Sequence, residues 1–200
     1  KVALKAAIFS VFGKKRENIP GFSPESFWSH ANYAAVAARV VGSQCDLFTG
    51  LDKEDLFIAG LLHDIGRIIL FENAPEPFAR CLEKARDGGV PLQQAEKEVF
   101  GFQHSDVGSV LAIKWFLPED LTIAIRYHHQ PEKDPFSQST SGLIHLADWM
   151  AWEAGQHSVQ GVEPPPLEEK VLEKLELDRE RIEALQEEAR ELFSQTEKPW

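Results

Sequence analysis

Residues 59–67 read Ala-Gly-Leu-Leu-His-Asp-Ile-Gly-Arg, and the pair His63-Asp64 within them decides how the rest of the chain is interpreted. The pair lies in an apolar run of helical character, where an ionised carboxylate is costly to bury unless a cation or several donors compensate it. An aspartate can bridge two divalent cations with its two oxygens, while the adjacent histidine binds one of them. The pair therefore predicts either a metal centre or a structural hydrogen-bonded pair.

Further candidate ligands lie on other apolar helical segments. A histidine taken singly is explained as a structural or surface residue. Taken together, two buried aspartates and several inward-facing histidines satisfy one another most economically around metal. The additional candidates are His30, His104, His128, His129 and Asp148. His145, three residues before Asp148, could hydrogen-bond to that aspartate or cap a neighbouring carbonyl, and both alternatives stay open.

The periodicity of apolar residues predicts an all-α fold, because no segment shows clean strand alternation bounded by turns. Pro24 and Pro118 mark helix starts, and Asp52 with Asp55 offers a cap before the helix that carries His63. Alanine-rich residues 24–48 suit a central helix with close neighbours. The expected helices span 2–12, 24–48, 53–72, 75–88, 91–100, 104–116, 118–129, 139–155, 167–176 and 178–194.

Length and composition indicate a globular protein with one main domain. The chain has 200 residues, of which 43% are hydrophobic, and its apolar runs fall short of the roughly 20 residues that a membrane span needs. Two isolated cysteines, Cys45 and Cys81, indicate a reduced, cytoplasmic protein rather than a disulfide framework. The net charge of -11 argues against non-specific binding to nucleic acid or to anionic lipid.

The charge and the prolines divide the chain into two parts. Three consecutive prolines at 164–166 separate a helical domain, residues 1–162, from an acidic helical extension, residues 163–200. The extension carries 12 acidic and 6 basic residues, which we interpret as a solvated helix face.

The order His, His-Asp, His, His-His, Asp resembles the HD superfamily of metal-dependent phosphohydrolases, and more finely its HDOD branch of bacterial signalling domains. The resemblance covers residues 1–155 and implies a multi-helix bundle around a buried His/Asp site. It also implies that further helices precede this chain. The segments that carry it are 27–30 (Phe-Trp-Ser-His), 59–66, 98–108 (from Glu-Val-Phe-Gly to Asp-Val-Gly), 115–118 (Trp-Phe-Leu-Pro), 125–131 and 146–148.

The related HD-GYP phosphodiesterases imply how the ligands divide between two divalent ions. One ion would be held by His30, His63, Asp64 and Asp148, and the other by Asp64, His104, His128 and His129, with Asp64 as the bridge. Imidazole and carboxylate suit iron, manganese, nickel or zinc without choosing among them. Two divalent ions against two aspartates leave a charge of about +2, which would attract hydroxide, phosphate or a carboxylate.

Three departures from the HD-GYP pattern bear on activity. Ser26 stands where some members have a glutamate, which disfavours a third metal. Arg67 replaces a lysine; it is a candidate clamp for an anion, or it pairs with a surface carboxylate, but its pKa is too high for proton donation. The segment after His129 is Gln-Pro-Glu-Lys-Asp-Pro, without the Gly-Tyr-Pro loop that the family ties to cyclic dinucleotide hydrolysis.

These features favour a regulatory signal-transduction domain of HDOD type that binds a dinuclear metal centre. Its expected partners are other signalling proteins or domains, and a small phosphorylated ligand is a further candidate. The first alternative is a phosphohydrolase or phosphodiesterase in which metal-activated water attacks phosphorus. The second alternative is a di-iron oxygenase. An enzyme should keep an open coordination position and a polar pocket, whereas a regulatory domain tolerates a closed site.

Overall fold

The computed structural model describes residues 19–45, 51–136 and 139–196, and within these ranges the chain is helical with two isolated β-bridges and no strand. The all-α fold predicted from the sequence is therefore confirmed. The helices are α2 (Pro24–Gly42), α3 (Lys53–Leu62), α4 (Ile65–Asn73), α5 (Pro75–Gly88), α6 (Leu92–Phe100), α7 (His104–Lys114), α8 (Glu119–Tyr127), the 3-10 turn η1 (Pro131–Lys133), α9 (Ser139–Glu153), α10 (Glu169–Lys174) and α11 (Arg179–Thr196).

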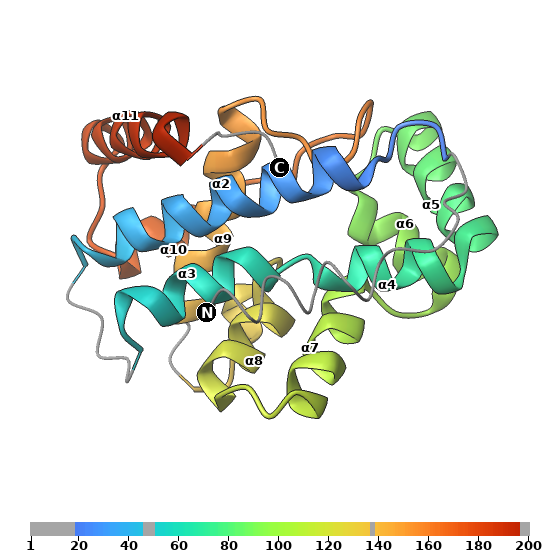
Figure 1. Ribbon diagram of the computed structural model, residues 1–200, viewed down its shortest axis with the longest axis horizontal. Coiled ribbons are helices and arrows are strands. Elements are labelled where there is room, and N and C mark those ends of the chain that lie inside the picture. The colour runs from blue at the N-terminus through green and yellow to red at the C-terminus, as the bar shows by residue number, and fades with distance from the viewer. Residues whose placement is uncertain (1–18, 46–50, 137–138, 197–200) are drawn as a thin grey trace.

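Helix α2 lies at the centre of the bundle. It packs along α3 on one side and against α9 and α11 on others, while α5 and α6 form a separate pair at one end (Figure 1). Small residues permit this arrangement: a Cβ atom on Gly60 would lie 2.7 Å from the Ala34 carbonyl oxygen and 2.8 Å from the Ala35 Cα atom. The alanine-rich segment therefore forms the close helix contact that its composition indicated.

The single helix expected over 53–72 is wrong, because the chain breaks it at His63-Asp64 into α3 and α4. The Arg67 amide donates to the Asp64 carbonyl at 2.8 Å, a short-range bond that starts α4 in a new direction. In one continuous helix, consecutive side chains point about 100° apart, so both could not face the same centre. The break lets His63 and Asp64 both point into the core.

The start of α4 is pressed against the start of α7. A Cβ atom on Gly66 would lie 1.9 Å from the His104 carbonyl oxygen, so only glycine allows the two backbones to approach so closely. This contact brings the turn that carries Asp64 next to His104.

Other helix boundaries differ from the expected ones mainly at their ends. Helix α2 ends at Gly42 rather than at 48, because the Ser43 hydroxyl donates to the Val40 carbonyl at 2.7 Å and the following amides close a turn. The cap predicted for α3 is present: Asp52 accepts from the Asp55 amide at 2.9 Å, and Asp55 accepts in return. The helix expected over 2–12 lies outside the described residues.

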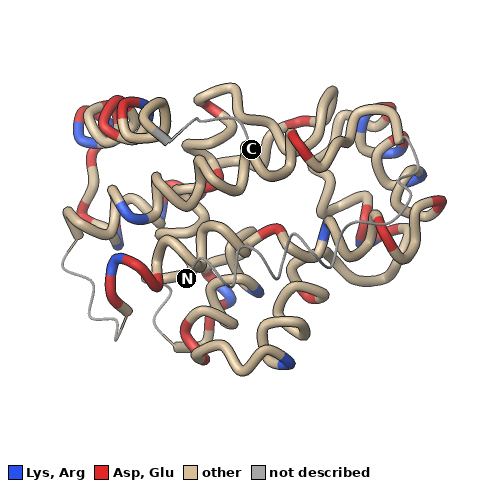
Figure 2. Tube along the Cα trace, viewed as in Figure 1, with Lys and Arg blue, Asp and Glu red and all other residues tan. Residues whose placement is uncertain are grey.

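The C-terminal helices share a core with the rest of the bundle. Phe193 of α11 packs on Tyr33 of α2, with ring centroids 5.0 Å apart, and Leu185 and Ala189 are buried in the same cluster. The acidic and basic side chains of α11 are exposed. The colours of Figure 2 mark these charged positions along α11, while the middle of α2 is largely uncharged. None of the described helices combines the length and the apolar character needed to cross a membrane.

Candidate metal centre

All seven predicted ligands come together in the interior. They lie on five segments, namely α2, the α3–α4 turn, the start of α7, the end of α8 and α9. Each side chain is between 0% and 2% exposed. The residues fall into two clusters whose potential ligand atoms lie within 4.8 Å of one another: group A is Asp64, His104, His128 and His129, and group B is His30, His63 and Asp148.

The backbone fixes the orientation of three of these histidines. The Nδ1 atoms of His30, His63 and His128 each lie 2.7 Å from a backbone carbonyl, of Gln156, Gly60 and Ile125 respectively. A carbonyl oxygen only accepts, so each Nδ1 carries a proton and donates it. In the neutral ring the lone pair then lies on Nε2, the atom that faces the interior.

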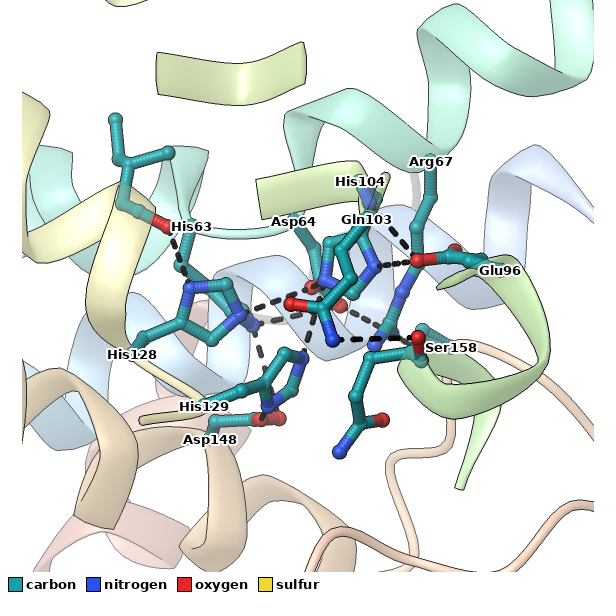
Figure 3. Close-up of polar contacts among 12 residues, drawn as sticks. His63, Asp64, Arg67, Glu96, Gln103, His104, His128, His129, Asp148 and Ser158 are labelled. Carbon is teal, nitrogen blue, oxygen red and sulfur yellow. Dashed lines mark hydrogen bonds and ion pairs between the residues drawn. The ribbon is translucent and has the colours of Figure 1, made fainter. Parts of the chain in front are cut away.

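The Nε2 atoms converge on one another. Those of His30 and His63 are 3.3 Å apart, and those of His104 and His129 are 3.1 Å apart. Figure 3 shows the rings of His104, His128 and His129 turned toward Asp64. Two lone pairs that face each other at this distance repel unless a proton or a metal ion lies between them, so the arrangement favours a cation.

The two aspartates lie among these nitrogens. Asp64 Oδ1 lies 2.9 Å from His104 Nε2 and 3.6 Å from His128 Nε2, while Asp64 Oδ2 lies 3.4 Å from His63 Nε2. Asp148 Oδ1 lies 3.1 Å from His30 Nε2. None of the four carboxylate oxygens accepts a hydrogen bond of regular geometry, although buried polar atoms are normally satisfied; Asp64 Oδ2 has an ion pair with Arg67 instead.

Unsatisfied carboxylate oxygens beside imidazole nitrogens fit a divalent ion of the iron, manganese, nickel or zinc type. Group A would supply one oxygen and three nitrogens, and group B one oxygen and two nitrogens. Asp64 lies between the groups, as a bridging ligand must. An ion bound there would neutralise the aspartates and lower the pKa of any water that it holds.

The surroundings keep three of the four group A ligands ready for a cation; the exception is His104, where burial lowers the pKa but Glu96 and Asp64 outweigh it and raise it. Burial raises the pKa of Asp64, but the charges of Arg67 and His63 outweigh it and hold that pKa well below its ordinary value. Burial lowers the pKa of His128 to about 4, and burial also lowers the pKa of His129. Asp64 is therefore ionised near neutral pH, and these two imidazoles keep a free lone pair.

His63 of group B behaves differently in the metal-free chain. Burial lowers its pKa, but Asp64 and Asp148 together outweigh burial and raise it to about 10. A metal ion in group B must therefore displace a proton from His63 at neutral pH.

Arg67 is neither paired with a surface carboxylate nor open to a ligand. Its side chain is 1% exposed, forms an ion pair with Asp64 and donates to the Ser158 hydroxyl at 2.6 Å. The expectation of a surface partner is wrong, because α4 begins directly after Asp64 and carries residue 67 back over that carboxylate.

Two further residues of the centre escaped the sequence analysis. Glu96 of α6 is fully buried and accepts from both the amide and the Nδ1 of His104, at 2.8 and 2.6 Å. Its position was detectable in principle, because it shares the apolar face of α6 with Leu92 and Ala95. Nothing in the sequence indicated that Ser158, in the segment after α9, would accept a hydrogen bond from Arg67.

The contacts of His145 decide between a hydrogen bond to Asp148 and the capping of a carbonyl. Its Nδ1 donates to the His128 carbonyl at 2.7 Å, and its Nε2 accepts from the Glu168 amide at 3.0 Å. It therefore caps a carbonyl and ties the end of α8 to the segment before α10.

Comparisons with known proteins agree with this architecture. A family model described as the HDOD domain matches residues 1–131. An uncharacterised protein of Treponema pallidum (strain Nichols) is 31% identical over 75 residues, which are 38% of this chain and 15% of that protein. An uncharacterised protein encoded in the pepC 5' region of Lactococcus lactis subsp. cremoris is 29% identical over 110 residues, 54% of this chain and 52% of that protein. The chain thus spans about half or less of these relatives.

Solved structures with the same fold include three bacterial proteins. A protein of Marinobacter aquaeolei VT8, provisionally named a signal transduction protein, has a TM-score of 0.76 at 22% identity. The match covers 96% of this chain and 42% of the Marinobacter chain. A provisionally named phosphohydrolase of Shewanella amazonensis SB2B has a TM-score of 0.67 at 19% identity, over 93% of this chain and 66% of its own. An HDOD domain protein of unknown function from Geobacter sulfurreducens has a TM-score of 0.59 at 22% identity, over 86% of this chain and 65% of its own.

Proposed function

This chain belongs to the HDOD domain family, and from that membership we propose that it is a regulatory domain of a bacterial signal-transduction protein with a structural or sensory centre of two divalent metal ions. The name given to the Marinobacter relative supports the regulatory role. Groups A and B supply the ligands of the two ions.

The closure of the centre carries this proposal. The seven ligand side chains are at most 2% exposed, and the cation nearest to them, Arg67, is engaged by Asp64 and Ser158. A hydrolase needs room at its metal for substrate and water. A regulatory centre needs only that its occupancy alter how the helices are held, and five segments meet at these ligands.

The partners that we propose are other signalling proteins or further domains of the same protein. A small phosphorylated ligand is less well supported, because the guanidinium group that would bind it is already paired inside the core. The chain spans 42% of the Marinobacter protein, which leaves room for such further domains in proteins of this kind.

Two measurements on purified protein test the proposal. Elemental analysis of protein prepared without chelator or nickel resin should give divalent metal bound to the chain. His63→Ala should lose the metal ion of group B and lower the melting temperature, because it removes a group B ligand from the core. Lys133→Ala, an exposed residue of η1, should change neither.

The metal-loaded protein should not hydrolyse an activated phosphodiester such as bis(p-nitrophenyl) phosphate. Turnover that is lost in His63→Ala would replace the regulatory proposal with the phosphohydrolase alternative, which the name of the Shewanella relative makes the next candidate. Metal content below about a tenth of an equivalent, even after incubation with each metal, would remove the metal centre from the proposal altogether.

A further inference from the structure

The two oxygens of Asp64 face different groups of ligands. Oδ1 lies near the group A nitrogens, 2.9 Å from His104 Nε2 and 3.6 Å from His128 Nε2. Oδ2 lies near the group B nitrogens, 3.4 Å from His63 Nε2 and 3.6 Å from His30 Nε2. With this arrangement, Asp64 could offer a different oxygen to an ion in each group.

Arg67 contacts only one of the two carboxylate oxygens of Asp64. Its Nη1 forms the ion pair with Oδ2, the oxygen that faces group B. From this contact we propose that Arg67 makes the two metal positions unequal. Group A binds its ion first and tightly, whereas group B binds its ion weakly because Arg67 already pairs with Asp64 Oδ2, the oxygen that faces group B. The inference rests on the metal centre proposed above and adds an order of filling to it.

Arg67 is held in this position by its surroundings. The side chain is 1% exposed, and its Nη1 also donates to the Ser158 hydroxyl at 2.6 Å. A guanidinium group stays charged at any pH that a protein tolerates, so it cannot yield to a metal ion by losing a proton. To free Oδ2, the chain would have to move a buried cation away from its counter-ion, which is costly.

The formal charges lead to the same order. Asp64, Asp148 and Glu96 contribute three negative charges to the buried cluster, and Arg67 contributes one positive charge. With the histidines counted as neutral ligands, one divalent ion makes this set neutral, whereas a second leaves two uncompensated positive charges in the interior. Because burying net charge is unfavourable, the second ion also needs an anion from solvent.

Ligand numbers add to the difference. Group A offers four protein ligands when Asp64 Oδ1 is included, and group B offers only His30, His63 and Asp148 while Arg67 keeps Oδ2. The group B position therefore depends on Arg67, and a change that displaces Arg67 from Asp64 would strengthen it.

Titration of chelator-stripped protein with Zn2+ by isothermal titration calorimetry tests the order of filling. Wild-type protein should bind a first equivalent at least tenfold more tightly than a second. His129→Ala, in group A, should lose the tight step, while His30→Ala, in group B, should keep the tight step and lose the weak one. Two equal steps in wild type, or loss of the tight step in His30→Ala alone, would overturn the inference.

The role of Arg67 itself is tested by Arg67→Met, which keeps an unbranched apolar chain but frees Asp64 Oδ2. The second step should tighten at least tenfold, whereas Arg67→Lys should stay closer to wild type because it retains a charge. Arg126→Met replaces a half-exposed arginine of α8 and should leave both steps unchanged.

An unchanged second step in an Arg67→Met protein that melts like wild type would contradict the role of Arg67 while leaving the metal centre standing. If Arg67→Met does not fold, the comparison of His30→Ala with His129→Ala decides the order of filling. Absence of any Zn2+ binding in wild type would overturn both this inference and the proposed metal centre.

Discussion

Glu96 orients His104 and thereby links α6 to the proposed metal centre. It accepts from the His104 amide and from Nδ1, so the imidazole presents Nε2 to Asp64. A carboxylate behind a ligating histidine fixes the ring and increases its basicity, and loss of such a partner typically weakens metal binding by about 10–100-fold. Glu96 belongs to neither group of potential ligands, so we assign it a positioning role in the proposed metal centre.

We expect Glu96→Gln to weaken Zn2+ binding in group A by roughly tenfold or more, because the neutral amide accepts less strongly from Nδ1. The matched control is Glu98→Gln, an exposed residue of the same helix that pairs with Lys84 at 2.6 Å. Calorimetric titration of both variants, with melting curves beside it, makes the comparison. Equal affinities for the two variants would show that Glu96 serves the fold rather than the metal.

The seven ligands and Glu96 differ in how well the sequence identifies them. His63-Asp64 and His128-His129 are unusual in apolar surroundings, and each candidate ligand that their pattern indicated lies in the cluster. Glu96 lies on the apolar face of α6, which indicates burial, but the sequence does not show that it accepts from His104, eight positions later. The ion pair between Arg67 and Asp64 could not be predicted from the sequence, because it depends on the direction in which α4 runs.

The break between α3 and α4 explains why that direction was not predicted. Apolar periodicity continues from residue 56 to residue 71, so the pattern favours one helix. The break is imposed by tertiary contacts that periodicity does not report, above all the approach of Gly66 to the His104 carbonyl.

Helix α11 is attached to α2 through a buried polar contact as well as through apolar packing. Gln186 of α11 donates to the Tyr33 hydroxyl at 3.1 Å and to the Met150 carbonyl at 2.9 Å. Burial raises the pKa of Tyr33 to about 12, although Arg190 partly offsets it. Ionisation of Tyr33 would therefore oppose the packing of these helices.

The raised pKa of Tyr33 predicts a loss of stability in alkali. An unfolded tyrosine has a pKa near 10, so the contribution is fully present below pH 10 and is lost as the pH rises toward 12. Tyr33→Phe should be less stable by about 1 kcal/mol at pH 8, through loss of a hydrogen bond, but should lose less stability than wild type between pH 10 and 12. Urea unfolding of both proteins at several pH values measures the difference.

Parallel curves for wild type and Tyr33→Phe would contradict the contribution of Tyr33.

For the whole molecule, the sequence predicted the helical class and the set of ligands better than the way the helices meet. Helices with their own caps and prolines, such as α5 at Pro75–Gly88, have the predicted bounds. The centre depends instead on segments far apart in sequence, for example the His30 ring against the Gln156 carbonyl. A pattern of residue types indicates that such groups share an interior, but the distances between them depend on the packing of all the helices.

Because five segments meet at the proposed metal ligands, removal of metal should lower the stability of the entire bundle. An ion that binds only the folded chain stabilises it by about 2.7 kcal/mol when its free concentration is a hundredfold above its dissociation constant. For a chain of 200 residues this corresponds to a fall of roughly 5–10 °C in melting temperature after chelation. Calorimetric melting before and after chelation, and again after Zn2+ or Mn2+ is restored, measures the shift.

His63→Ala should show a smaller shift, because one metal position is already lost. Mg2+ should restore little of the melting temperature, because imidazole is a poor ligand for it. A melting temperature that stays constant while elemental analysis shows the metal removed would mean that the histidine cluster holds the helices together without an ion.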